Sequence, residues 1–109
     1  MRSDQQRLVD IQEALHRIEK YRKQGERFFR RNELIQTWVI HHLQILGEAC
    51  CSMSEAFKKQ HPEIEWAKIR GMRNILVHGY FGVDLDIVWA VVEKDLPVIK
   101  KHIRHMLKN

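Results

Sequence analysis

Apolar residues recur at steps of three and four positions along nearly the whole chain of 109 residues. The run Leu8, Ile11, Leu15 and Ile18 is the clearest example. This spacing places the apolar side chains on one face of a helix. Only five glycines and two prolines interrupt the pattern, and no alternating, strand-like run of useful length is found. The sequence therefore predicts an all-α protein.

Turn and capping residues indicate where the first two helices begin and end. Ser3 opens a capping box with the glutamine three positions later, which predicts a first helix over residues 4–23. Gly25 offers a stop for that helix. A second apolar series then continues without a breaker until Pro62, which predicts one long helix over about 27–59.

The second half of the chain is divided in the same way. Pro62 suits the first turn of a third helix, and Gly79 is expected to end it. Asp84 can cap a fourth helix, which Pro97 should bend or restart. We expect an up-and-down bundle of four to five helices, formed by a single domain over residues 1–109.

Composition limits the protein classes. The longest apolar run, residues 87–92, is far too short to cross a bilayer, and the first residues contain no apolar signal region. We therefore expect a cytoplasmic protein without a membrane partner. Cys50 and Cys51 are neighbours whose side chains diverge on a helix, so we expect reduced packing thiols. A net charge of +5 favours a polyanionic partner such as RNA, although many basic proteins bind none.

Four polar residues, Arg73, Asn74, His78 and Tyr80, gather within eight positions near the end of the third helix. Histidine carries protons near neutral pH, and arginine can hold two phosphate oxygens. Asparagine can orient an imidazole. Together these groups suit cleavage of a phosphodiester. The alternative is structural, because arginine and asparagine also cap helix ends and a lone histidine often packs.

Helical geometry restricts how these groups can meet. Asn74 and His78 share a face, whereas Arg73 and His78 diverge by about 140° on a straight helix. They could meet if the helix ends at Gly79 or if the long arginine side chain sweeps around. We favour a homodimer, in which a two-fold axis brings a second copy of the helix alongside and supplies both an acid and a base without a metal.

One carboxylate stands midway along the second predicted helix. Gly47, Glu48 and Ala49 indicate close helix packing there, and Glu48 could pair with Arg73 or Arg70, or could orient His78. A purely structural pairing is the alternative.

The end of the chain carries a basic face beside an apolar one. Its cations could hold RNA phosphates or an acidic protein surface, or could form an ordinary solvated helix face. His102 and His105 lie three apart, but no third ligand is evident, so we expect no metal site and no cofactor. The basic residues are Lys100, Lys101, Arg104 and Lys108.

The segment from Arg73 to Tyr80, read as Arg-Asn-Ile-Leu-Val-His-Gly-Tyr, resembles the signature of the HEPN superfamily. Its tyrosine, two positions after the histidine, is typical of the HepT-like branch. Further landmarks of that branch occur in the same order along nearly the whole chain: Asp10-Ile11, Leu46-Gly47-Glu48-Ala49, Pro62, Trp66, Gly71-Met72-Arg73-Asn74, Val83-Asp84, Val88-Trp89 and Asp95-Leu96-Pro97. The chain is identified as a member of this HepT-like branch.

The resemblance implies a helical bundle that dimerises, with Arg73 and His78 of both copies lining an RNA-cleaving cleft and Asn74 supporting them. It implies a toxin endoribonuclease in which the ribose 2′-hydroxyl attacks the adjacent phosphate without a metal, leaving a cyclic phosphate.

The resemblance also implies a partner, a minimal nucleotidyltransferase antitoxin that attaches AMP to Tyr80 and so blocks RNA. Tyr80 could instead pack against Trp66 or Trp89. Many relatives carry an arginine near His41, where this chain has His41-His42. Two other hypotheses stay open: a catalytically silent, nucleotide-binding subunit of the transferase, and a purely structural helical dimer.

Overall fold

The computed structural model describes residues 2–78 and 82–108, with the side chains of residues 77, 78 and 108 outside that description. The described residues contain helices and no strand, which confirms the predicted all-α class. In chain order the elements are α1 (Asp4–Arg22), α2 (Glu26–Arg31), α3 (Glu33–Cys51), α4 (Glu55–Gln60), α5 (Trp66–His78), α6 (Leu85–Ala90), the π-helical segment η1 (Val91–Asp95) and α7 (Leu96–Lys108).

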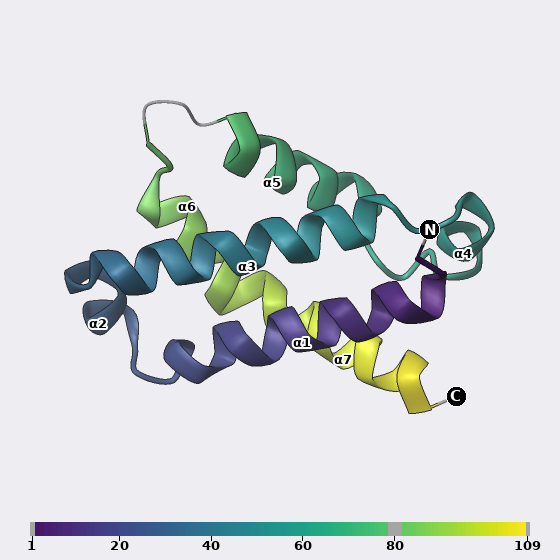
Figure 1. The fold of residues 1–109 in the computed structure, drawn as a ribbon, viewed down its shortest axis with the longest axis horizontal. Coiled ribbons are helices and arrows are strands. Elements are labelled where there is room, and N and C mark those ends of the chain that lie inside the picture. The colour runs from purple at the N-terminus through teal and green to yellow at the C-terminus, as the bar shows by residue number, and fades with distance from the viewer. Residues whose placement is uncertain (1, 79–81, 109) are drawn as a thin grey trace.

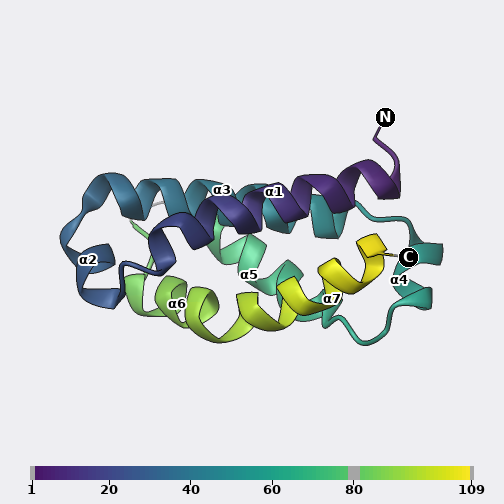
Figure 2. The same cartoon turned by 90° about the horizontal axis from the view of Figure 1, so that it is seen from below.

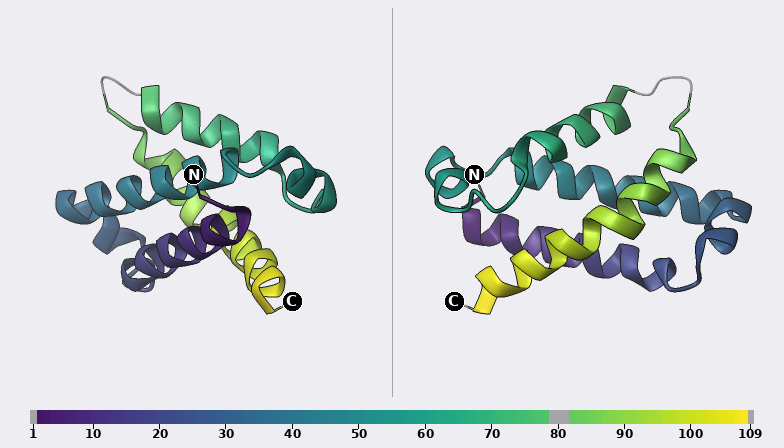
Figure 3. Two further views of the ribbon diagram at one scale, coloured as in Figure 1. Left: turned by 45° about the vertical axis from the view of Figure 1, so that its right-hand side comes forward. Right: turned by 180° about the vertical axis from the view of Figure 1, so that it is seen from behind.

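Helix α3 forms the spine of the bundle. It runs antiparallel to α1 on one side and to α5 on the other, and it packs against both (Figure 1). Helices α6 and α7 continue into one another through η1, and this long helix lies beneath α1 and α3 (Figure 2). From behind, it runs diagonally across the other two helices (Figure 3). The bundle thus leaves α3 and α5 side by side.

Helix α1 forms as the sequence predicts. The Ser3 hydroxyl accepts from the Gln6 amide at 3.1 Å, and the Gln6 side chain accepts from the Ser3 amide at 2.8 Å. This reciprocal cap satisfies two amides that the helix leaves free. The apolar face from Leu8 to Ile18 is buried. The predicted capping box and the core face of this helix are confirmed.

The single long helix predicted over 27–59 is wrong, because the chain turns twice within it. Asn32 has an extended backbone with φ −123° and ends α2, and its side-chain amide donates to the Phe28 carbonyl at 2.7 Å. The second turn precedes Ser54, which caps α4. The Asp4 carboxylate accepts from the Ser54 amide at 2.9 Å and from its hydroxyl at 2.6 Å. Contacts distant in the sequence fix the second turn.

The prediction is wrong for Pro62 and agrees with the structure for Pro97. Pro62 lies in the turn that follows α4, and α5 begins only at Trp66. Ile64 is buried, and the Trp66 indole donates to the His61 carbonyl at 3.0 Å, so the chain closes on itself before the helix begins. A new α-helix, α7, begins at Leu96 directly before Pro97, which agrees with the predicted restart. The π-helical turn just before it accommodates a residue that lacks an amide hydrogen. The cap at Asp84 is confirmed.

The buried core lies where the helices α1, α3 and the long C-terminal helix meet. Phe29 is fully buried and stacks on Trp89, with ring centroids 5.3 Å apart. Cys50 belongs to this core, and Cys51 is half-buried. No helix in the described ranges has the length and apolar character that a membrane span requires. The largest fully buried side chains are Phe29, Ile11, Ile18, Leu43, Leu46, Leu96 and Ile103.

Candidate functional site

Helices α3 and α5 pack closely where Gly47 faces Arg73. A methyl group on Gly47 would lie 2.9 Å from Cβ of Arg73 and 3.0 Å from its Cγ. Real side-chain carbons do not approach so closely, so this position requires glycine. The expectation that Gly47 marks close packing of helices is confirmed, and the first carbons of Arg73 are held against α3.

The guanidinium of Arg73 is then held by the next residue of α3. Arg73 Nη1 lies 3.3 Å from Glu48 Oε1, with side chains that are 27% and 56% exposed. The Nε of Arg73 is buried, and no described residue accepts its hydrogen. The predicted contact between Glu48 and Arg73 is confirmed, whereas Arg70 is exposed on α5. Because the Arg73 side chain is 27% exposed, the guanidinium N–H groups other than the buried Nε can still bind an anion.

A further tie between the two helices was not predicted from the sequence. Gln44 Nε2 donates to the Leu76 carbonyl oxygen at 3.1 Å across the interface. Gln44 and Glu48 are four residues apart and therefore share a face of α3. The helical spacing of Gln44 and Glu48 was the one signal in the sequence for this contact. The sequence does not reveal which helix packs on that face of α3.

The remaining motif residues lie on the outer side of α5 or outside the description. Asn74 is exposed, and the helix continues through residue 78, so positions 74 and 78 share a face as predicted. The side chain of His78, together with Gly79 and Tyr80, lies outside the described residues.

A polar groove runs along the seam of α1 and α3 beside this contact. It encloses about 410 Å³ and is lined from α3 by His41, Gln44 and Glu48 and from α1 by Arg7 and Asp10, among others. The groove therefore carries basic and acidic side chains, and it shares Glu48 with the Arg73 contact.

The two adjacent histidines of α3 differ in environment. His41 is exposed in the groove, whereas His42 is buried and packs edge-on against Trp38, with centroids 4.5 Å apart. Burial, together with the neighbouring His41, lowers the pKa of His42. Of these two histidines, only His41 is accessible to a ligand in this groove.

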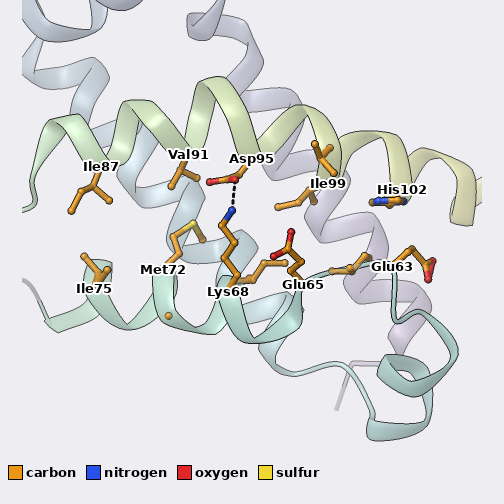
Figure 4. Close-up of a pocket in the computed structure, with 14 residues that line it drawn as sticks. Glu63, Glu65, Lys68, Met72, Ile75, Ile87, Val91, Asp95, Ile99 and His102 are labelled. Carbon is orange, nitrogen blue, oxygen red and sulfur yellow. Dashed lines mark hydrogen bonds and ion pairs between the residues drawn. The ribbon is translucent and has the colours of Figure 1, made fainter.

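A second concavity, mainly apolar and about 450 Å³ in volume, separates α5 from the long C-terminal helix (Figure 4). The Lys68 ammonium crosses it to the Asp95 carboxylate at 2.9 Å. Met72 and Ile75 line it from α5. Ile75 and Arg73 are about 160° apart around the helix, so this groove lies on a different side of α5 from the Arg73 contact.

The basic face at the end of the chain is present on α7. Lys101 and Arg104 are exposed, whereas Ile99 and Ile103 are buried, as the periodicity predicts. Lys100 lies 3.6 Å from the carboxylate of Glu19 on α1. The side chain of Lys108 lies outside the described residues. Two predicted cations of this face are therefore free of the core and open to solvent.

The chain matches the family described as "Ribonuclease HepT-like" over residues 11–106. The chain belongs to this HepT-like family. The match spans α3 and α5 in full, so the Gly47, Glu48 and Arg73 contact lies inside the family region. The family predicted from the motif and its landmarks is confirmed.

Several relatives of this HepT-like chain cover nearly its whole length. A protein of Thermococcus cleftensis named "Probable ribonuclease HepT" is 39% identical over 100 residues, which are 91% of each chain. A Methanocaldococcus jannaschii protein named "Putative RNase" is 36% identical over 97 residues, covering 88% of this chain and 89% of the relative. Another protein named "Putative RNase", from Caldanaerobacter subterraneus subsp. tengcongensis, is 30% identical over 98 residues. No solved structure matches the chain.

Proposed function

We propose that this chain is a toxin of a toxin-antitoxin system and acts as a metal-independent endoribonuclease. The observation that carries the proposal is the placement of Arg73, whose first carbons lie against Gly47 and whose guanidinium pairs with Glu48, on the helix that also carries His78. The HepT-like family and the ribonuclease names of its relatives support the same conclusion.

The proposed reaction needs only side chains and the substrate. The 2′-oxygen of a ribose forms a bond to the adjacent phosphorus, while the bond from phosphorus to the 5′-oxygen breaks. One His78 accepts the proton of the 2′-hydroxyl, and a second donates a proton to the leaving 5′-oxygen. Arg73 stabilises the charge on the phosphorane oxygens, and Asn74 orients the imidazole. The products carry a cyclic 2′,3′-phosphate and a 5′-hydroxyl.

A homodimer brings these groups together. Positions 73 and 78 diverge by about 140° on α5, and the exposed Arg70 and Asn74 lie on the face between them. An antiparallel copy of α5 on that face would place Arg73 of one protomer beside His78 of its partner. The site is then complete only in the dimer.

Regulation in this proposal acts at Tyr80. A minimal nucleotidyltransferase antitoxin transfers AMP from ATP to the phenolic oxygen and releases pyrophosphate. The added bulk and negative charge stand two residues from His78 and repel the RNA backbone. Co-expression with such a transferase should add the mass of one AMP to the wild-type chain and none to Tyr80→Phe. An unmodified wild-type chain in that experiment would contradict this part of the proposal.

The basic face of α7 supplies long-range attraction for RNA. Each phosphate contact made by Lys101 or Arg104 should add about 0.7 to the slope of log affinity against log salt. The double variant Lys101→Ala, Arg104→Ala should therefore bind RNA more weakly and with a slope lower by about 1.4. An unchanged slope would assign these cations to an ordinary solvated surface.

Cleavage assays with matched variants test the catalytic proposal. Purified wild type should cleave RNA in the presence of a chelator, and Arg73→Ala and His78→Ala should lose this activity. His16→Ala removes an exposed histidine of α1 and should retain it. End-group analysis should find cyclic phosphates. Absence of cleavage by the wild type would instead favour the silent subunit of a transferase.

A further inference from the structure

A glutamine of α3 is hydrogen-bonded to the part of α5 that carries His78. The Leu76 carbonyl lies in the last turn of α5, two residues before His78. Gln44 Nε2 donates to this carbonyl at 3.1 Å from a part-buried position. A hydrogen bond that joins residues 32 positions apart fixes tertiary structure and not merely the local helix.

This hydrogen bond and the arginine contact form one pair of ties. Gly47 and Glu48 contact Arg73. About one turn earlier on α3 and one turn later on α5, Gln44 is hydrogen-bonded to Leu76. Because α3 and α5 are antiparallel, the two ties lie at successive levels of the same interface. One contact holds Arg73, and the other holds the turn that carries His78.

We propose that Gln44 is a positioning residue, which sets the direction of the last turn of α5 and thereby the placement of His78 relative to Arg73. The inference rests on the proposed ribonuclease function and adds a residue to it. Gln44 itself touches no substrate in this account. It acts through the Leu76 carbonyl, two residues before the histidine.

The bundle offers a matched control for this role. Gln36 also lies on α3, and its Nε2 donates to the Phe29 and Arg30 carbonyls, at 3.0 and 3.2 Å, at the end of α2. Gln36→Leu and Gln44→Leu therefore each remove a side-chain donor from the end of a neighbouring helix. The two variants should lose similar stability, but of the two only Gln44→Leu alters the turn that carries His78.

The test compares the kinetics of both variants with those of the wild type. Gln44→Leu should lower kcat for RNA cleavage roughly tenfold to a hundredfold, with KM changed less than about threefold, because small misplacements of catalytic groups are costly. Gln36→Leu should stay within about twofold of the wild-type kcat. Equal kcat values for the two variants would overturn the proposal.

A conservative variant gives a second kinetic readout. Gln44→Glu keeps the size of the side chain, and its protonated form can donate to the Leu76 carbonyl whereas its ionised form cannot. The ratio of its kcat to the wild-type kcat should rise as the pH falls toward about 4.3, the ordinary glutamate pKa. A ratio independent of pH would contradict a role for the donated hydrogen bond.

Amide hydrogen exchange tests the inference independently of catalysis. In Gln44→Leu, the amides of residues 74–78 should exchange at least about fivefold faster than in Gln36→Leu, because the last turn of α5 opens more often. If the wild type cleaves no RNA, the proposed function fails, and this exchange result alone decides whether Gln44 holds the turn. Unchanged exchange would overturn the inference.

Discussion

Substitution of Gly47 by alanine tests the close contact between α3 and Arg73 in the proposed site. The new methyl carbon would lie 2.9 Å from Cβ of Arg73, whereas nonpolar carbons rest at about 3.5–4.0 Å. The two helices must therefore separate by at least about 0.6 Å at this level. Overpacking of this kind costs about 1–3 kcal/mol. The higher helix propensity of alanine offsets about 1 kcal/mol of this loss in stability.

A second glycine separates the cost of the close contact from the gain in helix propensity that alanine brings. A methyl group on Gly71, in α5, would meet nothing within 4 Å among the described residues, so Gly71→Ala should gain about 1 kcal/mol. The difference in stability between Gly71→Ala and Gly47→Ala should therefore be about 1–3 kcal/mol, equal to the overpacking cost alone.

Urea unfolding followed by tryptophan fluorescence measures this difference, with protein concentration held equal because a dimer gains stability by mass action. Gly47→Ala should also lower kcat for RNA cleavage, since Arg73 moves with the displaced helix. A Gly47→Ala protein as stable as Gly71→Ala would refute the packing argument. Full activity in a destabilised Gly47→Ala would refute the link between this contact and catalysis.

Three further predictions concern α3. Glu48→Gln should cost at most about 1 kcal/mol of stability, because the pair is partly exposed, but should lower kcat by loosening Arg73; unchanged kcat would contradict this. Burial raises the pKa of Cys50 to about 12, so iodoacetamide at about pH 8 should label Cys51 first, as peptide mass mapping would check. Burial lowers the pKa of His42 from 6.5, so the unfolded chain binds the proton first on acidification. Stability supported by neutral His42 is lost as pH falls from 6.5 through the folded pKa. His42→Leu should flatten this part of the stability profile, and an equally steep profile would contradict the assignment.

Local signals predicted part of the fold. The capping box at Ser3 and the cap at Asp84 depend on residues within three positions, so their sequence pattern was sufficient. The turn before Ser54 depends on Asp4, which is 50 positions away, and no local breaker marks it. The same limit applies to Pro62, where packing of the preceding turn delays the helix to Trp66.

Part of the geometry around the candidate site was also predictable from local signals. The motif named Arg73 and Asn74 as candidates, and Glu48, next to the small Gly47, was a predicted partner that the structure places beside Arg73. Gln44 was missed because its role depends on the register between α3 and α5, which sequence periodicity does not specify. Helix geometry gave the divergence of positions 73 and 78, and that divergence is the reason for proposing a shared site between two copies.

Mixing the wild type with an inactive variant tests that shared site most directly. His78→Ala is expected to be inactive alone. When equal amounts of the two are mixed and allowed to exchange protomers, about half of the dimers are mixed, and each mixed dimer has only one of the two histidines that the shared cleft needs. About a quarter of the dimers stay wild type, so RNA cleavage should fall to about a quarter of the rate of the same total amount of wild type. A mixture that keeps about half of that rate, after exchange has been verified by mass, would contradict the account.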